Sequence, residues 1–277
     1  MQIHTPIIES TVMASISQMI VPEEMYQTGW IYNFFCNVTM DKKAGVFSFE
    51  DYRMFWEYGI LLKRYFEYPW REYTTMQQIY DFLTGYLDKK YYVVNYLENF
   101  TFRGEAFKPY LLLYDYDKEG HIIKFCCWND KDKVRYYQTE FAEYYDKILM
   151  PQKSEANLRF DMLFMRGEFE KQWDLEIIKG NFERAEISNW KAGFFINRMN
   201  EEQQKHSLCV LQEWRDVFLE RLAFMKRKGM LKNDEIIKKV LELKGKQENS
   251  SNLKRNLKDM IRTYNHLCLW FITSIKS

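Results

Sequence analysis

Hydrophobic and polar positions alternate most regularly between Lys108 and Leu149. Aromatic and β-branched residues form three runs in this stretch, and two clusters of turn-forming residues separate them, Asp117–Gly120 and Asn129–Lys133. The runs are Tyr110–Asp117, Ile122–Trp128 and Val134–Thr139. A similar run, Tyr91–Leu97, comes before them. The pattern predicts that these four segments form one antiparallel sheet, which a short amphipathic helix follows.

Upstream of this sheet, apolar residues recur at three- and four-residue steps and predict a helix. Thr74 and Gln77 have the spacing of a capping box at its start. Its apolar face consists of Ile79, Phe82, Leu83 and Tyr86. Nearer the N-terminus, Ile8–Ile20 is a second, shorter helix candidate that ends at a proline. Residues 99–107 are expected to form a loop between the predicted strands Tyr91–Leu97 and Tyr110–Asp117.

The character of the sequence changes after Met150. Asn157–Arg166 can supply one more strand, and the chain from Glu168 onward is predominantly helical in pattern. Two apolar stripes have helical spacing: Leu211, Trp214, Phe218, Leu222 and Met225, and then Leu253, Leu257, Met260, Ile261, Tyr264, Cys268 and Phe271. The predicted fold class is therefore α+β. We expect an α+β domain over residues 1–150 and a mainly helical region over residues 151–277 that packs on it.

Composition and charge narrow the function classes. Nearly half of the 277 residues are apolar and 18% are aromatic, which excludes disorder of the whole chain. The net charge of +1 gives no general attraction to nucleic acid or to an anionic membrane. The N-terminal segment lacks the features of a signal peptide, and the apolar run Leu267–Ile272 is too short to span a bilayer. These features predict a soluble, cytoplasmic protein.

The cysteines predict neither a metal site nor a disulfide framework. They stand at positions 36, 126, 127, 209 and 268, without CxxC spacing and without a well-placed histidine. Cys126 and Cys127 are adjacent, so on a strand they point to opposite faces. We interpret the cysteines as buried free thiols, and no metal or cofactor is predicted.

Two of the predicted strands carry a resemblance to a known family. The segments Tyr110-Leu111-Leu112-Leu113-Tyr114-Asp115-Tyr116-Asp117 and Tyr91-Tyr92-Val93-Val94 are similar to sheet strands of the butirosin biosynthesis protein H family. The resemblance implies a papain-like, cysteine-protease-like fold, in which helices pack on a mixed antiparallel sheet. It also implies acyl or amide transfer during the synthesis of a peptide-type natural product. The type member moves an acyl group from a carrier-protein thioester to an amine.

The catalytic residues that this resemblance leads us to expect are missing. The cysteine should stand at the start of the first helix, but Glu9–Ser15 contains none and offers only Ser10, which is equally suited to capping the helix. Phe107, Lys108 and Pro109 occupy the place of the histidine. Asn129 or Asp130 stands near the position of the orienting residue, although both also suit a turn. We therefore predict no catalytic residue.

The leading hypothesis is a non-catalytic binding or accessory protein of a peptide-type natural-product pathway. It would hold a peptide, a carrier protein or a pathway enzyme in the groove between the first helix and the strand Tyr110–Asp117. Phe107, Tyr110, Trp128 and Ser10 are the residues expected to line this groove. The competing interpretation is that side chains have filled the groove, so that Phe107 is ordinary core.

Two other functions stay open from the sequence. One is an acyltransferase or amide synthetase with relocated catalytic residues, for which Cys36 is the candidate nucleophile. The other is a structural subunit of a homo-oligomer, because tyrosine, phenylalanine and tryptophan are abundant and interfaces favour them.

Overall fold

The chain divides into two compact units, and neither unit is a continuous segment. The computed structural model describes residues 1–21, 37–49, 61–69, 74–98, 100–154, 157–165, 175–184, 187, 189–247 and 252–275. Unit 1 comprises Met1–Pro22 and Phe55–Phe169, and unit 2 comprises Glu23–Met54 and Glu170–Ser277. This division differs from the expected boundary at residue 150. Strand pairing explains the difference, because the last strand of the unit 1 sheet lies beyond residue 150.

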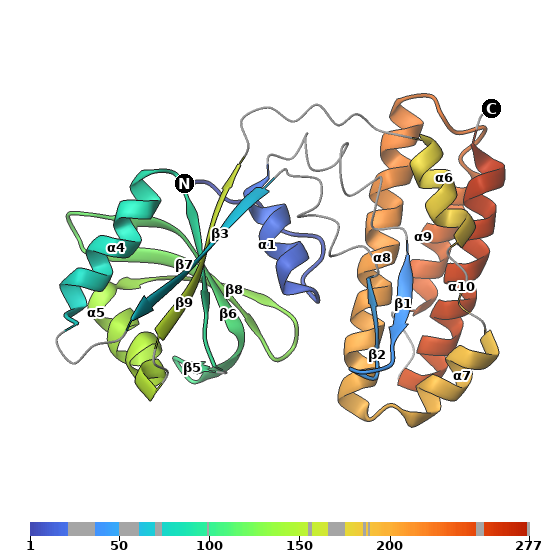
Figure 1. Ribbon diagram of the computed structural model, residues 1–277. Coiled ribbons are helices and arrows are strands. Elements are labelled where there is room, and N and C mark those ends of the chain that lie inside the picture. The colour runs from blue at the N-terminus through green and yellow to red at the C-terminus, as the bar shows by residue number, and fades with distance from the viewer. Residues whose placement is uncertain are drawn as a thin grey trace. The chain divides into compact units, whose positions relative to one another are not determined.

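Unit 1 contains an antiparallel sheet in the order β3-β9-β4-β6-β7-β8, with β5 paired to β6 (Figure 1). Its strands are β3 (Leu61–Pro69), β4 (Tyr92–Tyr96), β5 (Phe100–Phe102), β6 (Glu105–Asp117), β7 (Ile122–Asn129), β8 (Val134–Glu140) and β9 (Asn157–Met165). Every pairing between these strands is antiparallel. The predicted single sheet of four segments is confirmed, and so is the extra strand after residue 157. The α+β fold class with an antiparallel sheet is confirmed as well.

The expectation of a loop over residues 99–107 is wrong. β5 and the first part of β6 form a hairpin there, and Arg103 and Gly104 are the two residues of its turn. Both have positive φ, 49° and 83°, as a type I′ turn requires. The rings of Phe100 and Phe107 stack across the hairpin with centroids 5.4 Å apart. An Arg-Gly pair is a weaker hairpin signal than Asn-Gly or Asp-Gly, and the sequence pattern therefore did not reveal the turn.

Helix α4 (Met76–Asp88) begins with a capping box one residue later than the sequence suggested. The hydroxyl of Thr75 accepts a hydrogen bond from the Gln78 backbone N–H at 3.2 Å. In return, the Gln78 side chain accepts from the Thr75 backbone N–H at 2.8 Å. The predicted pair, Thr74 and Gln77, is therefore corrected to Thr75 and Gln78. The predicted apolar face of the helix packs on the sheet as expected.

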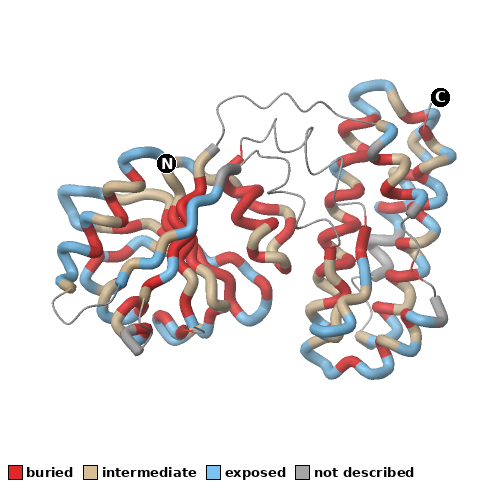
Figure 2. The backbone as a smooth tube through the Cα atoms, viewed as in Figure 1, coloured by how far each residue is buried: buried red, intermediate tan, exposed pale blue. Residues whose placement is uncertain are grey.

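The main core of unit 1 has the sheet on one side, and α4 together with the segment that follows β8 on the other (Figure 2). That segment consists of α5 (Phe141–Tyr144), the π-helical turn η3 (Tyr145–Leu149) and the 3-10 turn η4 (Met150–Ser154). Core side chains from the strands include Val93, Phe107, Leu111, Leu113, Phe125, Cys127, Phe160 and Met162. Full burial of each large apolar side chain contributes roughly 1.5–3 kcal/mol relative to exposure. We call this side of the sheet the α4 face.

The opposite side of the sheet, which we call the α1 face, is partly covered by α1 (Val12–Ile20) (Figure 1). The Trp128 indole N–H donates a hydrogen bond to the Ser15 hydroxyl at 3.0 Å. The sulfur atoms of Cys126 and Met19 are 3.9 Å apart. The Gln18 side chain accepts hydrogen bonds from the backbone N–H groups of the segment before the helix. Every residue of α1 except Met13 is buried, including both of its serines.

Unit 2 is helical, with one hairpin. It contains β1 (Val38–Asp41), β2 (Val46–Phe49), α6 (Leu175–Arg184), α7 (Asn189–Arg198), α8 (Glu201–Arg227), α9 (Glu235–Gln247) and α10 (Leu253–Ser274). All members of the two predicted apolar stripes except the partly exposed Leu253 are buried, which confirms them as core. The hairpin packs on α8, and the Phe47 N–H donates to the Ser207 hydroxyl at 3.0 Å. Of the helices in the described ranges, none is both long and apolar enough to cross a membrane.

Candidate functional site

Phe107 lies in the core and not in a groove beside α1. Its side chain is 3% exposed and belongs to the α4 face of the sheet. Its ring contacts Tyr137 edge-on, with centroids 5.8 Å apart, in addition to the stacked Phe100. The competing interpretation of the sequence, in which residue 107 is ordinary core, describes this position correctly.

Two of the other three expected groove residues are buried as well. Trp128 is on the α1 face but fully buried against Ser15. Ser10 is 5% exposed and precedes α1, for which Thr11 is the N-cap residue. Tyr110 is half-buried and lies on the α1 face, where it pairs with Tyr96. The sheet separates Phe107 from the other three, so the four residues do not line one groove.

The register of the strands shows which side chains accompany Tyr110 on the α1 face. One row of directly paired residues crosses the sheet: Cys126, Leu112, Val94, Asp161 and Tyr65. Directly paired residues of antiparallel strands point to the same face. Since Cys126 contacts α1, the whole row lies on the α1 face. The next row on that face contains Tyr110, Tyr96 and Arg159.

Asp161 is the unusual member of this row, because it is a buried carboxylate on an interior strand of the sheet. Its side chain is fully buried. One oxygen, Oδ2, accepts a hydrogen bond from the Tyr96 hydroxyl and lies 2.6 Å from the Lys63 ammonium nitrogen. That nitrogen also donates to the Tyr96 hydroxyl at 3.3 Å. The three polar groups form a closed triangle, which we call the Asp161 cluster.

The other carboxylate oxygen, Oδ1 of Asp161, has no hydrogen-bond partner among the described residues, although it too is buried. A buried acceptor without a partner costs about 1–3 kcal/mol, and more when it is charged. Native proteins leave few such groups, and many of those serve a binding or catalytic role. The unmet acceptor makes the Asp161 cluster the best candidate for a functional site in unit 1.

Aromatic side chains surround the Asp161 cluster. The rings of Tyr96 and Tyr110 meet edge-on with centroids 5.3 Å apart, and the Tyr65 side chain is 52% exposed. Burial raises the pKa of Tyr96, and its hydrogen bond to Asp161 raises the pKa further. Tyr96 therefore stays protonated and remains a hydrogen-bond donor to the carboxylate. A pocket of about 230 Å³ is lined by Tyr96 and Arg159 among others, whereas Asp161 and Lys63 do not line it.

Comparison with known proteins identifies no relative of this chain. No protein-family model, no curated protein and no solved structure matches this chain. Within the described ranges, no three histidine, cysteine, aspartate or glutamate side chains come close enough together to hold a metal ion.

The sequence of β9 contains a signal for this site. Between Leu158 and Met165, all residues except Arg159 and Asp161 are apolar. A single acidic residue in such a strand needs hydrogen-bond or ion-pair partners when the strand is buried. Lys63 and Tyr65 alternate along β3 and so belong to one face. Their pairing with β9 could not be deduced, because the two strands are far apart in the sequence.

The described cysteines lack the features of a nucleophile. Cys126, Cys127 and Cys268 are buried, and Cys209 is partly buried. Burial raises the pKa of both the Cys126 and the Cys127 thiol, which reduces the fraction of reactive thiolate. As predicted, Cys126 and Cys127 point to opposite faces of the sheet. Cys36, the candidate nucleophile of the acyltransferase hypothesis, lies outside the described residues.

Iodoacetamide is expected to label Cys126, Cys127 and Cys268 in the folded protein far more slowly than in the urea-unfolded protein. The reason is that all three sulfur atoms are shielded, and that burial also disfavours the thiolates of Cys126 and Cys127. Mass spectrometry of peptides after timed labelling at neutral pH measures each site separately, with Cys209 as the more accessible internal reference. Rapid labelling of Cys126 or Cys127 would contradict the burial described here. Rapid labelling of Cys36 would favour the acyltransferase hypothesis.

Proposed function

We propose that this protein is a non-catalytic binding or accessory protein of a peptide-type natural-product pathway, built on a papain-like fold. Its ligand would be an extended peptide segment, held on the α1 face of the sheet at Tyr110 and the Asp161 cluster. The observation that carries the proposal is the Oδ1 atom of Asp161, which has no hydrogen-bond partner among the described residues and which the ligand would reach by displacing the side chains that cover it. The pathway and the papain-like fold rest on the resemblance of the strand segments alone.

The chemistry of the Asp161 cluster favours a neutral N–H donor as the ligand group. A carboxylate accepts hydrogen bonds and cannot donate them, so a group that satisfies Oδ1 has to be a donor. Lys63 already balances the negative charge at 2.6 Å. An ammonium group of a ligand would place a second cation beside one carboxylate, whereas a peptide N–H adds no charge. A peptide amide is therefore the donor that suits this position best.

The surrounding tyrosines suit the rest of an extended peptide. Tyr65, Tyr96 and Tyr110 offer flat aromatic surfaces with polar hydroxyl groups, a combination that binding sites favour. The three residues come from β3, β4 and β6, so the rigid sheet holds them. Sites of this kind gain affinity because few groups have to be ordered when the ligand binds.

The proposal is tested by affinity selection from a pooled library of short peptides with acetylated and amidated ends. Binders identified by mass spectrometry are then measured against the Asp161→Asn variant. In this variant the carbonyl oxygen faces Lys63 and Tyr96, which leaves the amide NH₂ to face the ligand N–H. We expect affinity to fall by about tenfold or more, because a hydrogen bond to a charged group contributes about 1.5–3 kcal/mol.

Asp146→Asn is the matched control, since Asp146 is an exposed acid in η3, on the other side of the sheet from the Asp161 cluster. This control variant should keep the affinity of the unchanged protein. The proposal is refuted if no peptide is selected, or if the selected peptides bind the Asp161→Asn variant as tightly as the control.

A further inference from the structure

Positive charge is concentrated on two helices of unit 2, although the whole chain carries a net charge of only +1. α7 and α10 together contain six basic residues and one acidic residue, Asp259. The basic residues are Lys191, Arg198, Lys254, Arg255, Lys258 and Arg262. These two helices pack against each other, so most of this charge lies in one region. No such region is evident from the sequence, because residues 189–198 and 253–274 are far apart in the chain.

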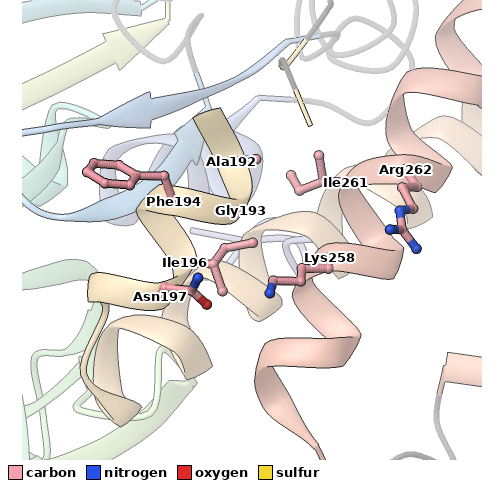
Figure 3. Close-up of a pocket in the computed structure, with 8 residues that line it drawn as sticks. All are labelled: Ala192, Gly193, Phe194, Ile196, Asn197, Lys258, Ile261 and Arg262. Atoms are coloured by element: carbon pink, nitrogen blue, oxygen red, sulfur yellow. The ribbon is translucent and has the colours of Figure 1, made fainter. Parts of the chain in front are cut away.

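The first pocket of this region lies between α7 and α10 and has a volume of about 430 Å³. We call it the Lys258 pocket. Figure 3 shows the Lys258 side chain of α10 reaching toward Asn197 of α7, while Phe194 points away from the pocket. Arg262 is at its edge, 3.6 Å from Asp259. Among the described residues, no carboxylate lies within ion-pair distance of Lys258.

The second pocket lies on the other side of Phe194, next to the β1–β2 hairpin, and has a volume of about 480 Å³. We call it the Phe195 pocket. Its apolar lining comes from Met40, Phe194, Phe195 and Met199. Its basic lining comes from Lys42, Lys191 and Arg198, and no described carboxylate forms an ion pair with any of these three residues. The Gln203 side chain donates to the Ala44 carbonyl at 3.1 Å, which ties the hairpin to α8.

Phe194 links the two pockets, because it contributes to the lining of both. Its side chain is 51% exposed, and the Arg198 guanidinium lies 4.0 Å from the centre of its ring. An exposed aromatic ring with an arginine beside it is a common centre of protein–protein interfaces. On this chain, Lys191 and Arg198 line the Phe195 pocket together with this ring, and no described carboxylate is within ion-pair distance of either side chain.

We infer that the Lys258 and Phe195 pockets form a docking surface for an acidic protein segment, in which an apolar side chain is flanked by carboxylates. The apolar side chain enters the Phe195 pocket, where the two methionines adapt to its shape. The carboxylates bind Lys191 and Arg198, which line that pocket, and Lys258 in the neighbouring Lys258 pocket. Charge complementarity of this kind selects the partner and speeds its association. This inference concerns unit 2 and does not depend on the function proposed for the sheet of unit 1.

The arrangement of the cations favours an acidic protein segment over nucleic acid. A phosphate backbone is bound by a row of basic groups that follows its charges. On this surface three basic residues, Lys42, Lys191 and Arg198, line an apolar pocket instead, and the exposed ring that could stack on a base is in contact with Arg198. Carboxylates on either side of one apolar residue match that arrangement better.

The inference is tested by selecting a phage-displayed random peptide library on the immobilised full-length chain. Selected peptides are then synthesised with a fluorophore, and their affinities are measured by fluorescence anisotropy. We expect the selected sequences to carry acidic residues on both sides of an aromatic or aliphatic residue. Their binding should weaken as salt is added, because salt screens the exposed charges.

Two variants identify the surface to which the peptides bind. Lys191→Glu/Arg198→Glu/Lys258→Glu reverses three charges, and Phe194→Ala removes the central ring. Both should weaken binding by about tenfold or more, the size of effect expected for central interface residues. The matched control, Arg227→Glu/Lys238→Glu/Lys239→Glu, makes the same charge change at exposed positions of α8 and α9 and should bind like the unchanged protein. Circular dichroism checks that every variant is folded.

Four outcomes of the peptide experiments would overturn the inference. The first two are that no peptide is enriched and that the selected peptides lack acidic residues. The other two are that the control variant loses binding as strongly as Lys191→Glu/Arg198→Glu/Lys258→Glu, and that both test variants retain full affinity. Tighter binding of a fluorescent single-stranded oligonucleotide than of the selected peptides would also overturn it and indicate a nucleic-acid surface.

Discussion

Replacing Phe107 with alanine is expected to destabilise unit 1 by about 3–5 kcal/mol, the cost of removing a large buried aromatic side chain. Phe107 is 3% exposed and packs between Phe100 and Tyr137. Its removal leaves a cavity that the sheet cannot easily close, because β6 is paired at this residue with both β5 and β7. Hydrogen exchange of the β6 and β7 amides, followed by mass spectrometry, measures the loss in unit 1 alone.

Tyr110→Ala provides the matched control on the same strand. Tyr110 is half-buried and faces the opposite side of the sheet, so its removal opens no enclosed cavity. We expect a loss of about 1 kcal/mol, typical of a substitution outside the core. A loss for Phe107→Ala as small as that for Tyr110→Ala would contradict the placement of Phe107 in the core. It would also restore the hypothesis of an open groove at residue 107.

Replacing Lys63 with methionine is expected to destabilise unit 1 by about 3 kcal/mol. The substitution removes the cation next to a fully buried carboxylate and leaves Asp161 with the Tyr96 hydroxyl as its partner. Breaking a buried ion pair from one side costs about 3–5 kcal/mol, and we expect the lower end because the Lys63 side chain is 39% exposed. Urea denaturation, with hydrogen exchange of the β9 amides as a local probe, measures the effect.

The double variant Lys63→Met/Asp161→Asn distinguishes a charge effect from lost packing. A neutral amide at position 161 needs no counter-ion, so the double variant should recover most of the stability that Lys63→Met loses. If the double variant is as unstable as Lys63→Met, the loss comes from packing of the lysine stem and not from the carboxylate.

The parts of the fold that local patterns determine were predictable from the sequence. The hairpins from Tyr110 to Thr139 follow from alternating residues and polar turns, and the helical stripes follow from three- and four-residue spacing. The hairpin at Arg103-Gly104 was missed because its turn residues are unusual for a type I′ turn. The division into units could not be predicted, since it depends on pairing between β3 and β9, which no local pattern reveals.

The candidate site was predictable only in part. Tyr110 was placed near it, but Phe107 was assigned to the same groove although the two positions are three residues apart. With the two-residue period of a strand, residues 107 and 110 point to opposite faces, so this error was avoidable. Asp161 and Lys63 were not identified, because each matters only through contact with the other. The resemblance rests on the sequences of two strands, and such a similarity does not predict a contact between side chains of two other strands.

The place of β9 in the sheet has a consequence for folding. β3 and β4 are separated by β9, which is the last strand to leave the ribosome. Until residues 157–165 have been synthesised, each of those two strands presents an unpaired edge to other chains, a known route to aggregation. Such long-range pairing also slows folding. A shortened chain that ends near residue 150 would therefore lack the strand that joins the two parts of the sheet.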